Sequence, residues 1–197
     1  MRNDEPVTRP ASRQRRGEEA EVVFQGKLFQ VWQWQQELFD GSVTTFEQLS
    51  RPDTVLVLPI TTSGEALFLE ESQPGTAPMF RTIGGRVEPG EAPEMAALRE
   101  LREESGYETG ELRLWAAWQP INKIDWAVYL FVAHRLSAPV ELNLDAGEKV
   151  TLRSILASEL LDAPSAPALD DNEFLYQLNF ARSDADERRR VEALLHN

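Results

Sequence analysis

The stretch from Gly85 to Tyr107, GRVEPGEAPEMAALRELREESGY, constrains this chain more than any other feature. Pro93 suits the first turn of a helix, where its missing N–H would have no partner, and Gly106 suits a left-handed C-terminal cap. The residues between them are mostly strong helix formers. The spacing therefore predicts a loop, a helix over residues 92–105 and a second loop.

Three glutamates share one face of this helix. Glu100 and Glu104 are four residues apart and Glu100 and Glu103 three apart, so their carboxylates crowd together. Hard cations such as Mg²⁺ take oxygen ligands and keep positions for water and substrate phosphates. Arg99 can orient or partly neutralise the carboxylates. A merely solvated acidic face is the alternative, but it explains neither the glycines nor Glu91.

Composition limits the classes of partner. A chain of 197 residues with 42% hydrophobic residues can bury a sizeable core. A net charge of −13 disfavours long nucleic acid as a partner, because nucleic-acid binding needs a basic protein face. A small phosphorylated nucleotide can still bind, because a bound metal ion can supply the positive charge. The absence of cysteine excludes thiol catalysis and disulfides. Neither a membrane span nor a signal peptide is recognisable, so we expect a cytoplasmic protein without a membrane partner.

Taken together, the motif resembles the Nudix box of the Nudix hydrolases. The matching positions are Gly85, Glu91, Arg99, Glu100, Leu101, Glu103, Glu104 and Gly106. Only Tyr107 departs from the pattern, at a packing position. The resemblance implies an α/β fold, an α/β/α sandwich with a mixed sheet. It also implies an enzyme acting on phosphorus-containing anhydrides, with Mg²⁺ as cofactor and Mn²⁺ as a substitute.

The resemblance also assigns roles to single residues. Glu100 and Glu104 are expected to be the main metal ligands, with Glu103 and the Gly84 carbonyl as additional ones. The general base is left open between Glu103 and Glu148, and a plain surface position is the alternative for Glu148. The resemblance also places Arg99 in the catalytic set. Gly85, Glu91 and Gly106 are expected to shape the box, with Glu91 holding the loop against Arg99.

The chain divides into three parts. Residues 1–20 are polar, arginine-rich and aperiodic, which predicts a disordered tail. Residues 21–50 predict an antiparallel hairpin whose apolar surface favours a homodimer. Residues 51–197 form the hydrolase domain, in which 54–60 and 66–70 are expected to make a buried hairpin. Further strands are expected over 112–119, 126–136 and 149–156, and helices over 170–180 and 184–195.

Beyond the box, the order of elements is similar to the ADP-ribose pyrophosphatase branch, which also hydrolyses other nucleoside diphosphate sugars. This similarity implies cleavage into a nucleoside monophosphate and a phosphorylated product. Arg81 and Lys123 are expected to pair with phosphate or carboxylate groups of the substrate. Trp126 is expected to stack on a base or ribose, with a core position as the equal alternative.

Two other functions stay open at this point. A nucleoside triphosphate or RNA-cap pyrophosphohydrolase is favoured by the arginine-rich tail and disfavoured by the missing basic face. A non-catalytic nucleotide sensor would keep the fold, but such proteins usually lose box carboxylates, and none is lost here.

Overall fold

Alternating side chains on two central strands set the layers of the fold. In the computed structural model, which describes residues 7–72, 79–140, 149–162 and 169–196, β4 (Thr54–Pro59) pairs in parallel with β10 (Val128–Leu136). Val55 and Val57 join one core, and Leu56 and Leu58 join the other. Because successive side chains leave a strand on opposite faces, a continuous apolar run here produces a sheet that is buried on both sides.

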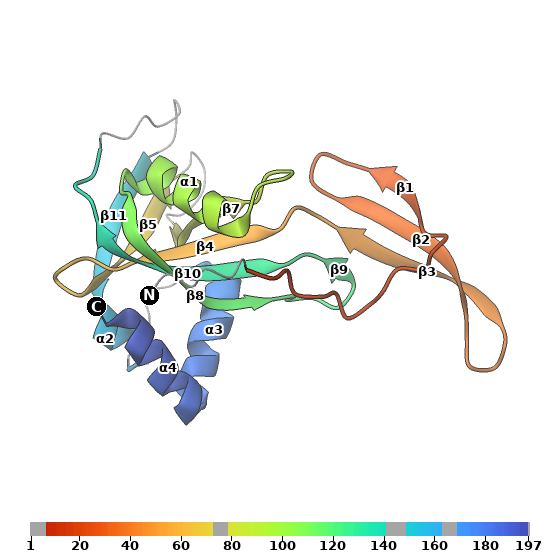
Figure 1. The fold of residues 1–197 in the computed structure, drawn as a ribbon. Helices are drawn as coiled ribbons and strands as arrows, with labels where there is room; N and C mark the ends of the chain where they lie inside the picture. Colours follow the sequence, from red (N-terminus) through yellow and green to blue (C-terminus); the bar gives the residue numbers. More distant parts are fainter. Residues whose placement is uncertain (1–6, 73–78, 141–148, 163–168, 197) are drawn as a thin grey trace.

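In the described residues, two sheets and four helices build the body of the molecule, whose arrangement can be followed in Figure 1. The central mixed sheet has the order β7-β4-β10-β8, where β7 is Ile83–Arg86 and β8 is Thr109–Trp118. The second, antiparallel sheet has the order β11-β5-β6, with β5 at Glu65–Ser72, β6 at Met79–Arg81 and β11 at Lys149–Leu156. Helix α1 (Pro93–Ser105) packs into one core, and the other core contains α2 (Ala157–Leu160), α3 (Asn172–Ser183) and α4 (Ala185–Leu195). The predicted α/β/α sandwich with a mixed sheet is confirmed.

Strands β4 and β5 do not form the predicted hairpin. The turn between them is present, since the Thr61 N–H donates to the Glu65 carbonyl at 2.9 Å. Only one bridge, between Ile60 and Ala66, links the two strands. Both edges of β4 are already paired, one with β7 and one with β10, so the chain leaves the central sheet after the turn and starts the second sheet.

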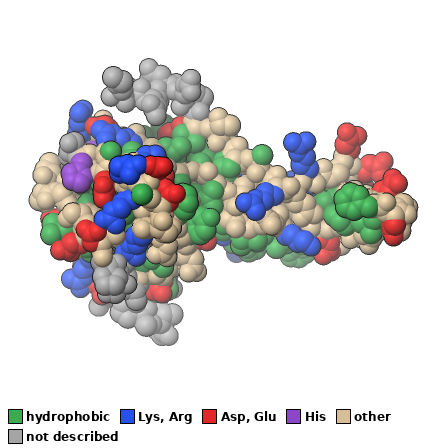
Figure 2. Space-filling view, turned by 90° about the horizontal axis from the view of Figure 1, so that it is seen from below, with side chains coloured by type: hydrophobic (Ala, Val, Ile, Leu, Met, Phe, Trp, Pro, Cys, Tyr) green, Lys and Arg blue, Asp and Glu red, His purple; other side chains and the backbone are tan. Residues whose placement is uncertain are grey.

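The N-terminal sheet stands apart from the body. It contains β1 (Glu21–Gln25), β2 (Gln30–Glu37) and β3 (Val43–Ser50), and the short β9 (Ile124–Asp125) pairs in parallel with β3 at its base. Figure 2 shows this sheet as a projection with hydrophobic side chains gathered near its far end. Val23, Phe24 and Val43 are all more than half exposed. The predicted antiparallel hairpin is thus present, with one further strand before it.

Residues 7–20 differ from the predicted disordered tail. Arg9 forms ion pairs with Asp53 at 2.7 Å and with Asp125 at 2.8 Å, and Arg16 reaches the other oxygen of Asp125 at 2.7 Å. Both aspartates are partly buried, so these arginines satisfy charges that the body would otherwise leave unpaired. Side-chain pairs order this segment without any apolar periodicity. Residues 1–6 lie outside the described part of the chain.

Within the described ranges, no helix is long and apolar enough to cross a membrane.

Candidate active site

Helix α1 begins and ends at the residues that its sequence indicates. Pro93 opens the helix, and Gly106 closes it with φ of 74°, where its N–H donates to the Arg102 carbonyl at 3.0 Å. Ala97 and Leu101 are fully buried in the core beneath the helix. This packing fixes the rotation of α1 about its axis and therefore the direction of its acidic face.

Arg99 joins the helix to the loop that precedes it. Its Nε and Nη2 each donate to one oxygen of Glu91 at 3.0 Å, and Nη2 also donates to the Arg86 carbonyl at 2.9 Å. Its Nη1 donates to Glu100 Oε1 at 2.7 Å and to Glu103 Oε2 at 3.2 Å. The hydrogen bond to Glu91 is the largest cause that raises the pKa of Arg99. The predicted contact between Glu91 and Arg99 is present, and the same guanidinium reaches the acidic face.

Glu100 is half-buried against the backbone of Gly85. A Cβ added to Gly85 would lie 2.2 Å from Glu100 Oε1, so the absence of a side chain there makes room for the carboxylate. Burial is the main cause that raises the pKa of Glu100. The hydrogen bond from Arg99 opposes it, and the charges of Glu104 and Glu103 add to it. A carboxylate whose charged form is disfavoured in this way gains from a nearby cation.

Glu104 is held by backbone and by an arginine. The Gly84 N–H donates to Glu104 Oε2 at 2.9 Å, and Arg81 donates to both oxygens, at 2.7 and 3.2 Å. The Arg81 Nε also donates to Glu71 Oε2 at 2.7 Å. Sequence analysis missed Glu71, because a lone glutamate near the end of a strand carries no local signal. Arg81, expected to bind substrate, bonds to these two carboxylates, and its substrate contact stays a prediction.

These residues suit a divalent cation. No three Asp, Glu, His or Cys side chains of the described residues converge as a metal-binding group, and Arg81 and Arg99 bond to the glutamates. The ion pairs of these two arginines nonetheless bring together more carboxylates than guanidinium groups, five against two. Carboxylate oxygens are the donors that Mg²⁺ and Mn²⁺ prefer. Glu100 and Glu104 are the residues that would hold such an ion, and Glu103, 58% exposed, stands beside them.

Two predicted residues are not settled by this geometry. The Gly84 carbonyl stays a predicted ligand, because the contact that the structure gives for Gly84 is made by its N–H. Glu148 lies outside the described residues, so its role as base or ligand also stays a prediction.

A hollow of about 520 Å³ opens beside the carboxylates. Pro52, Arg86, Val87, Pro89, Arg99 and Glu100 are among the residues that line it. Arg86, missed by sequence analysis, is an exposed cation on this rim. Burial is the main cause that lowers the pKa of the neighbouring Arg51; Glu173 opposes this lowering, and the positive charge of Arg86 adds to it. Two adjacent guanidinium groups favour an anion such as a phosphate.

Lys123 and Trp126 lie at the base of the N-terminal sheet. Lys123 is exposed, and its carbonyl accepts a hydrogen bond from the Leu49 N–H at 2.9 Å. Trp126 is only 7% exposed, its Nε1 donates to Thr54 Oγ1 at 2.9 Å, and the Arg51 guanidinium lies 4.4 Å from its ring centre. Burial favours the core alternative for Trp126, and its substrate contact stays a prediction.

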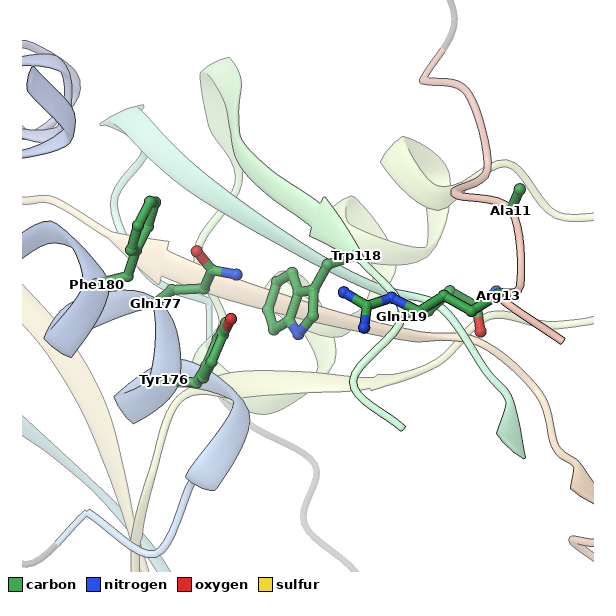
Figure 3. Close-up of a pocket in the computed structure, with 7 residues that line it drawn as sticks. All are labelled: Ala11, Arg13, Trp118, Gln119, Tyr176, Gln177 and Phe180. Atoms are coloured by element: carbon green, nitrogen blue, oxygen red, sulfur yellow. The ribbon is translucent and has the colours of Figure 1, made fainter. Parts of the chain in front are cut away.

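A second hollow lies where β8 meets α3 (Figure 3). The rings of Trp118 and Tyr176 are stacked with centroids 6.5 Å apart, and Arg13 and Gln119 complete the rim. Trp118 packs against the core that contains α3, whereas α1 belongs to the other core. This hollow is therefore separate from the acidic face of α1.

Comparison with known proteins identifies the family. The NUDIX domain matches residues 50–177, so the chain belongs to the NUDIX family and is a pyrophosphohydrolase. It is 30% identical over 166 residues to the ADP-ribose pyrophosphatase of Bacillus subtilis (strain 168), covering 81% of this chain and 88% of that protein. The predicted resemblance to the ADP-ribose pyrophosphatase branch is confirmed. Proteins of this family generally use divalent metals.

Two further likenesses were found. The methanol dehydrogenase activator of Bacillus methanolicus is 29% identical over 144 residues, covering 72% of this chain and 78% of that protein. A crystal structure of an ADP compounds hydrolase superposes with a TM-score of 0.66 at 20% identity, covering 91% of this chain and 95% of the other. At that identity the second likeness shows the fold alone.

Replacement of Gly85 by alanine tests the placement of Glu100. The nearest atoms to the added Cβ all belong to the Glu100 carboxylate, so this group must move while the backbone needs no change. We expect Mn²⁺ affinity to fall by about tenfold or more, as for losses of support around metal ligands. Titration of free Mn²⁺ by electron paramagnetic resonance measures it. Gly110→Ala, whose Cβ would meet Arg135 at an ordinary 3.4 Å, is the control. Equal affinities in the two variants would remove Glu100 from the metal site.

Proposed function

We propose that this enzyme hydrolyses a nucleoside diphosphate linked to another moiety, of the ADP-ribose or nucleotide sugar type, with Mg²⁺ or alternatively Mn²⁺. The products are a nucleoside monophosphate and a phosphorylated compound. The main support is the acidic face of α1, which Arg99 holds at the edge of a hollow that also exposes Arg86. Two linked phosphates carry negative charge that must be stabilised during cleavage, and a metal ion next to a guanidinium provides the positive charge for this.

The roles follow from exposure and charge. A bound divalent metal supplies charge neutralisation on the phosphates and a lowered pKa for an attacking water. Glu100 and Glu104 hold the ion, and Arg86 pairs with a phosphate oxygen from the rim. Glu103 is the most exposed of the three glutamates on the face and has Arg99 to orient it, so it is placed to accept the proton of the water. Glu148 remains the other candidate for this base.

In the proposed reaction, the water oxygen forms a bond to one phosphorus as the bond from that phosphorus to the bridging oxygen breaks. The bridging oxygen leaves with the other phosphate. The proton of the water passes to the base, Glu103 or Glu148, and then to solvent. Atoms and charge balance as the net addition of one water across the anhydride.

The alternatives have less support. A triphosphate or RNA-cap substrate would be served by free cations in the arginine-rich segment, but Arg9 and Arg16 are paired with Asp53 and Asp125. A sensor without activity would have no need of the complete set of box carboxylates that this chain keeps.

Replacement of Glu104 by glutamine tests the enzymatic proposal. The change keeps the shape of the side chain but removes a charged ligand, so turnover should fall by orders of magnitude while the protein stays folded. The assay uses ADP-ribose, nucleotide sugars, dinucleoside polyphosphates and nucleoside triphosphates with Mg²⁺, followed by product identification. Glu108→Gln, at an exposed pair just after the same helix, is the control and should keep full activity. Near-full activity of the Glu104 variant would refute the assignment.

We further propose that the enzyme is a homodimer that uses residues 21–50. Strand β1 is exposed along its whole length, and an exposed strand with apolar residues favours pairing with a second chain.

Charge placed on β1 should therefore separate the subunits. Val23→Glu is expected to give a monomer by light scattering at micromolar concentration, where the unmodified protein is a dimer. Phe180→Glu, at a comparably exposed position on α3, should leave the dimer intact. An unmodified protein that is monomeric at high micromolar concentration would contradict this proposal.

A further inference from the structure

Arg81 connects two carboxylates that come from different layers of the fold. Its Nε is 2.7 Å from Glu71 Oε2 on β5, and its Nη2 is 2.7 Å from Glu104 Oε1 on α1. In the antiparallel pair of β5 and β6, Arg81 lies opposite Leu69, so Glu71 is its diagonal neighbour on the same face. The side chain of Glu71 is 11% exposed and that of Glu104 20% exposed. The Arg81 guanidinium therefore lies between two largely buried carboxylates, those of Glu71 and Glu104.

Glu104 and Glu100 differ in how many of their carboxylate oxygens accept hydrogen bonds. Within the described residues, hydrogen bonds reach Glu104 at both oxygens, from Arg81 and from the Gly84 N–H, but reach Glu100 at Oε1 alone. A guanidinium does not lose its proton under ordinary conditions, and its fork grips both oxygens of one carboxylate. The side of Glu104 that faces Glu71 is consequently occupied by a fixed positive charge.

We infer that Arg81 is a built-in cation of the active site, which takes the position between Glu71 and Glu104 that a divalent ion would otherwise fill. Arg81 thereby limits the number of metal ions that the site holds and orients Glu104 toward the ion shared with Glu100. This inference rests on the proposed metal-dependent function. It makes Arg81 a positioning residue rather than a group that contacts substrate.

The inference has a direct consequence for metal binding. Without Arg81, the carboxylates of Glu71 and Glu104 lose the guanidinium that both of them bond to, which is costly for two shielded charges. A divalent ion is the simplest replacement, because both groups offer hard oxygen donors. Loss of the arginine should thus add a metal site instead of destroying one.

The experiment is a titration of Mn²⁺ without substrate, followed by electron paramagnetic resonance of the free ion. Arg81→Met should bind one more Mn²⁺ per chain than the unmodified protein. The double variant Arg81→Met, Glu71→Gln should return to the unmodified number, because one wall of the new site is lost. Arg153→Met removes another arginine, itself exposed, that pairs with β5 through the neighbouring Glu70, and should change nothing.

Arg81→Lys is a second variant in case the methionine variant does not fold. It keeps the charge but loses the two-oxygen grip that orients Glu104, so the number of ions stays the same while Mn²⁺ binds about tenfold more weakly, as for loss of a partner that orients a metal ligand. Folding of each variant is checked by thermal unfolding with and without Mn²⁺.

The outcomes separate the two proposals. An unmodified protein that binds no Mn²⁺ would overturn the metal site and the inference that rests on it. If the unmodified protein binds Mn²⁺ and folded Arg81→Met binds the same number, Arg81 is only a structural ion pair and this inference alone fails. If Arg81→Met does not fold, an unchanged affinity in Arg81→Lys overturns it equally.

Discussion

The active site depends on one guanidinium. Arg99 donates from all three of its nitrogens, to Glu91, Glu100, Glu103 and the Arg86 carbonyl. It holds the loop before α1 in place and keeps mutually repelling carboxylates on one helix face. Because arginine stays protonated, this arrangement needs no bound ion to persist. The hollow beside the helix is lined by the same loop, so the hollow and the acidic face share one support.

Close approach of backbone to carboxylate is the second requirement. The buried residues of α1 press the helix onto the central sheet, whose edge strand β7 brings Gly84 and Gly85 beneath the glutamates. A side chain at Gly85 would occupy the space of the Glu100 carboxylate, and the Gly84 N–H donates to Glu104. Gly85 is therefore part of the site because it leaves room for the Glu100 carboxylate, and Gly84 because its N–H binds Glu104.

Features that depend on local spacing were predictable from the sequence. The ends of α1, its buried face and the contact between Glu91 and Arg99 all lie within a single 13-residue helix and the loop before it. Features that depend on distant partners were not. The order of residues 7–20 rests on Asp53 and Asp125, and the separation of β4 from β5 rests on edges already filled by other strands. Glu71 is joined to the site by Arg81, which comes from another strand. Trp126 sits beside a continuous apolar run, where nothing local distinguishes a core ring from a binding ring.

Anomalous diffraction from crystals soaked in Mn²⁺ tests the central claim most directly, because it locates the ion independently of turnover. We expect a peak about 2 Å from carboxylate oxygens of Glu100 and Glu104, as for a hard divalent ion bound to oxygen ligands. Arg99 should still contact Glu91, and Arg81 should still contact Glu71. A peak only at sites away from α1, with the glutamates still bonded to the arginines alone, would contradict the claim that this face is the metal-binding centre.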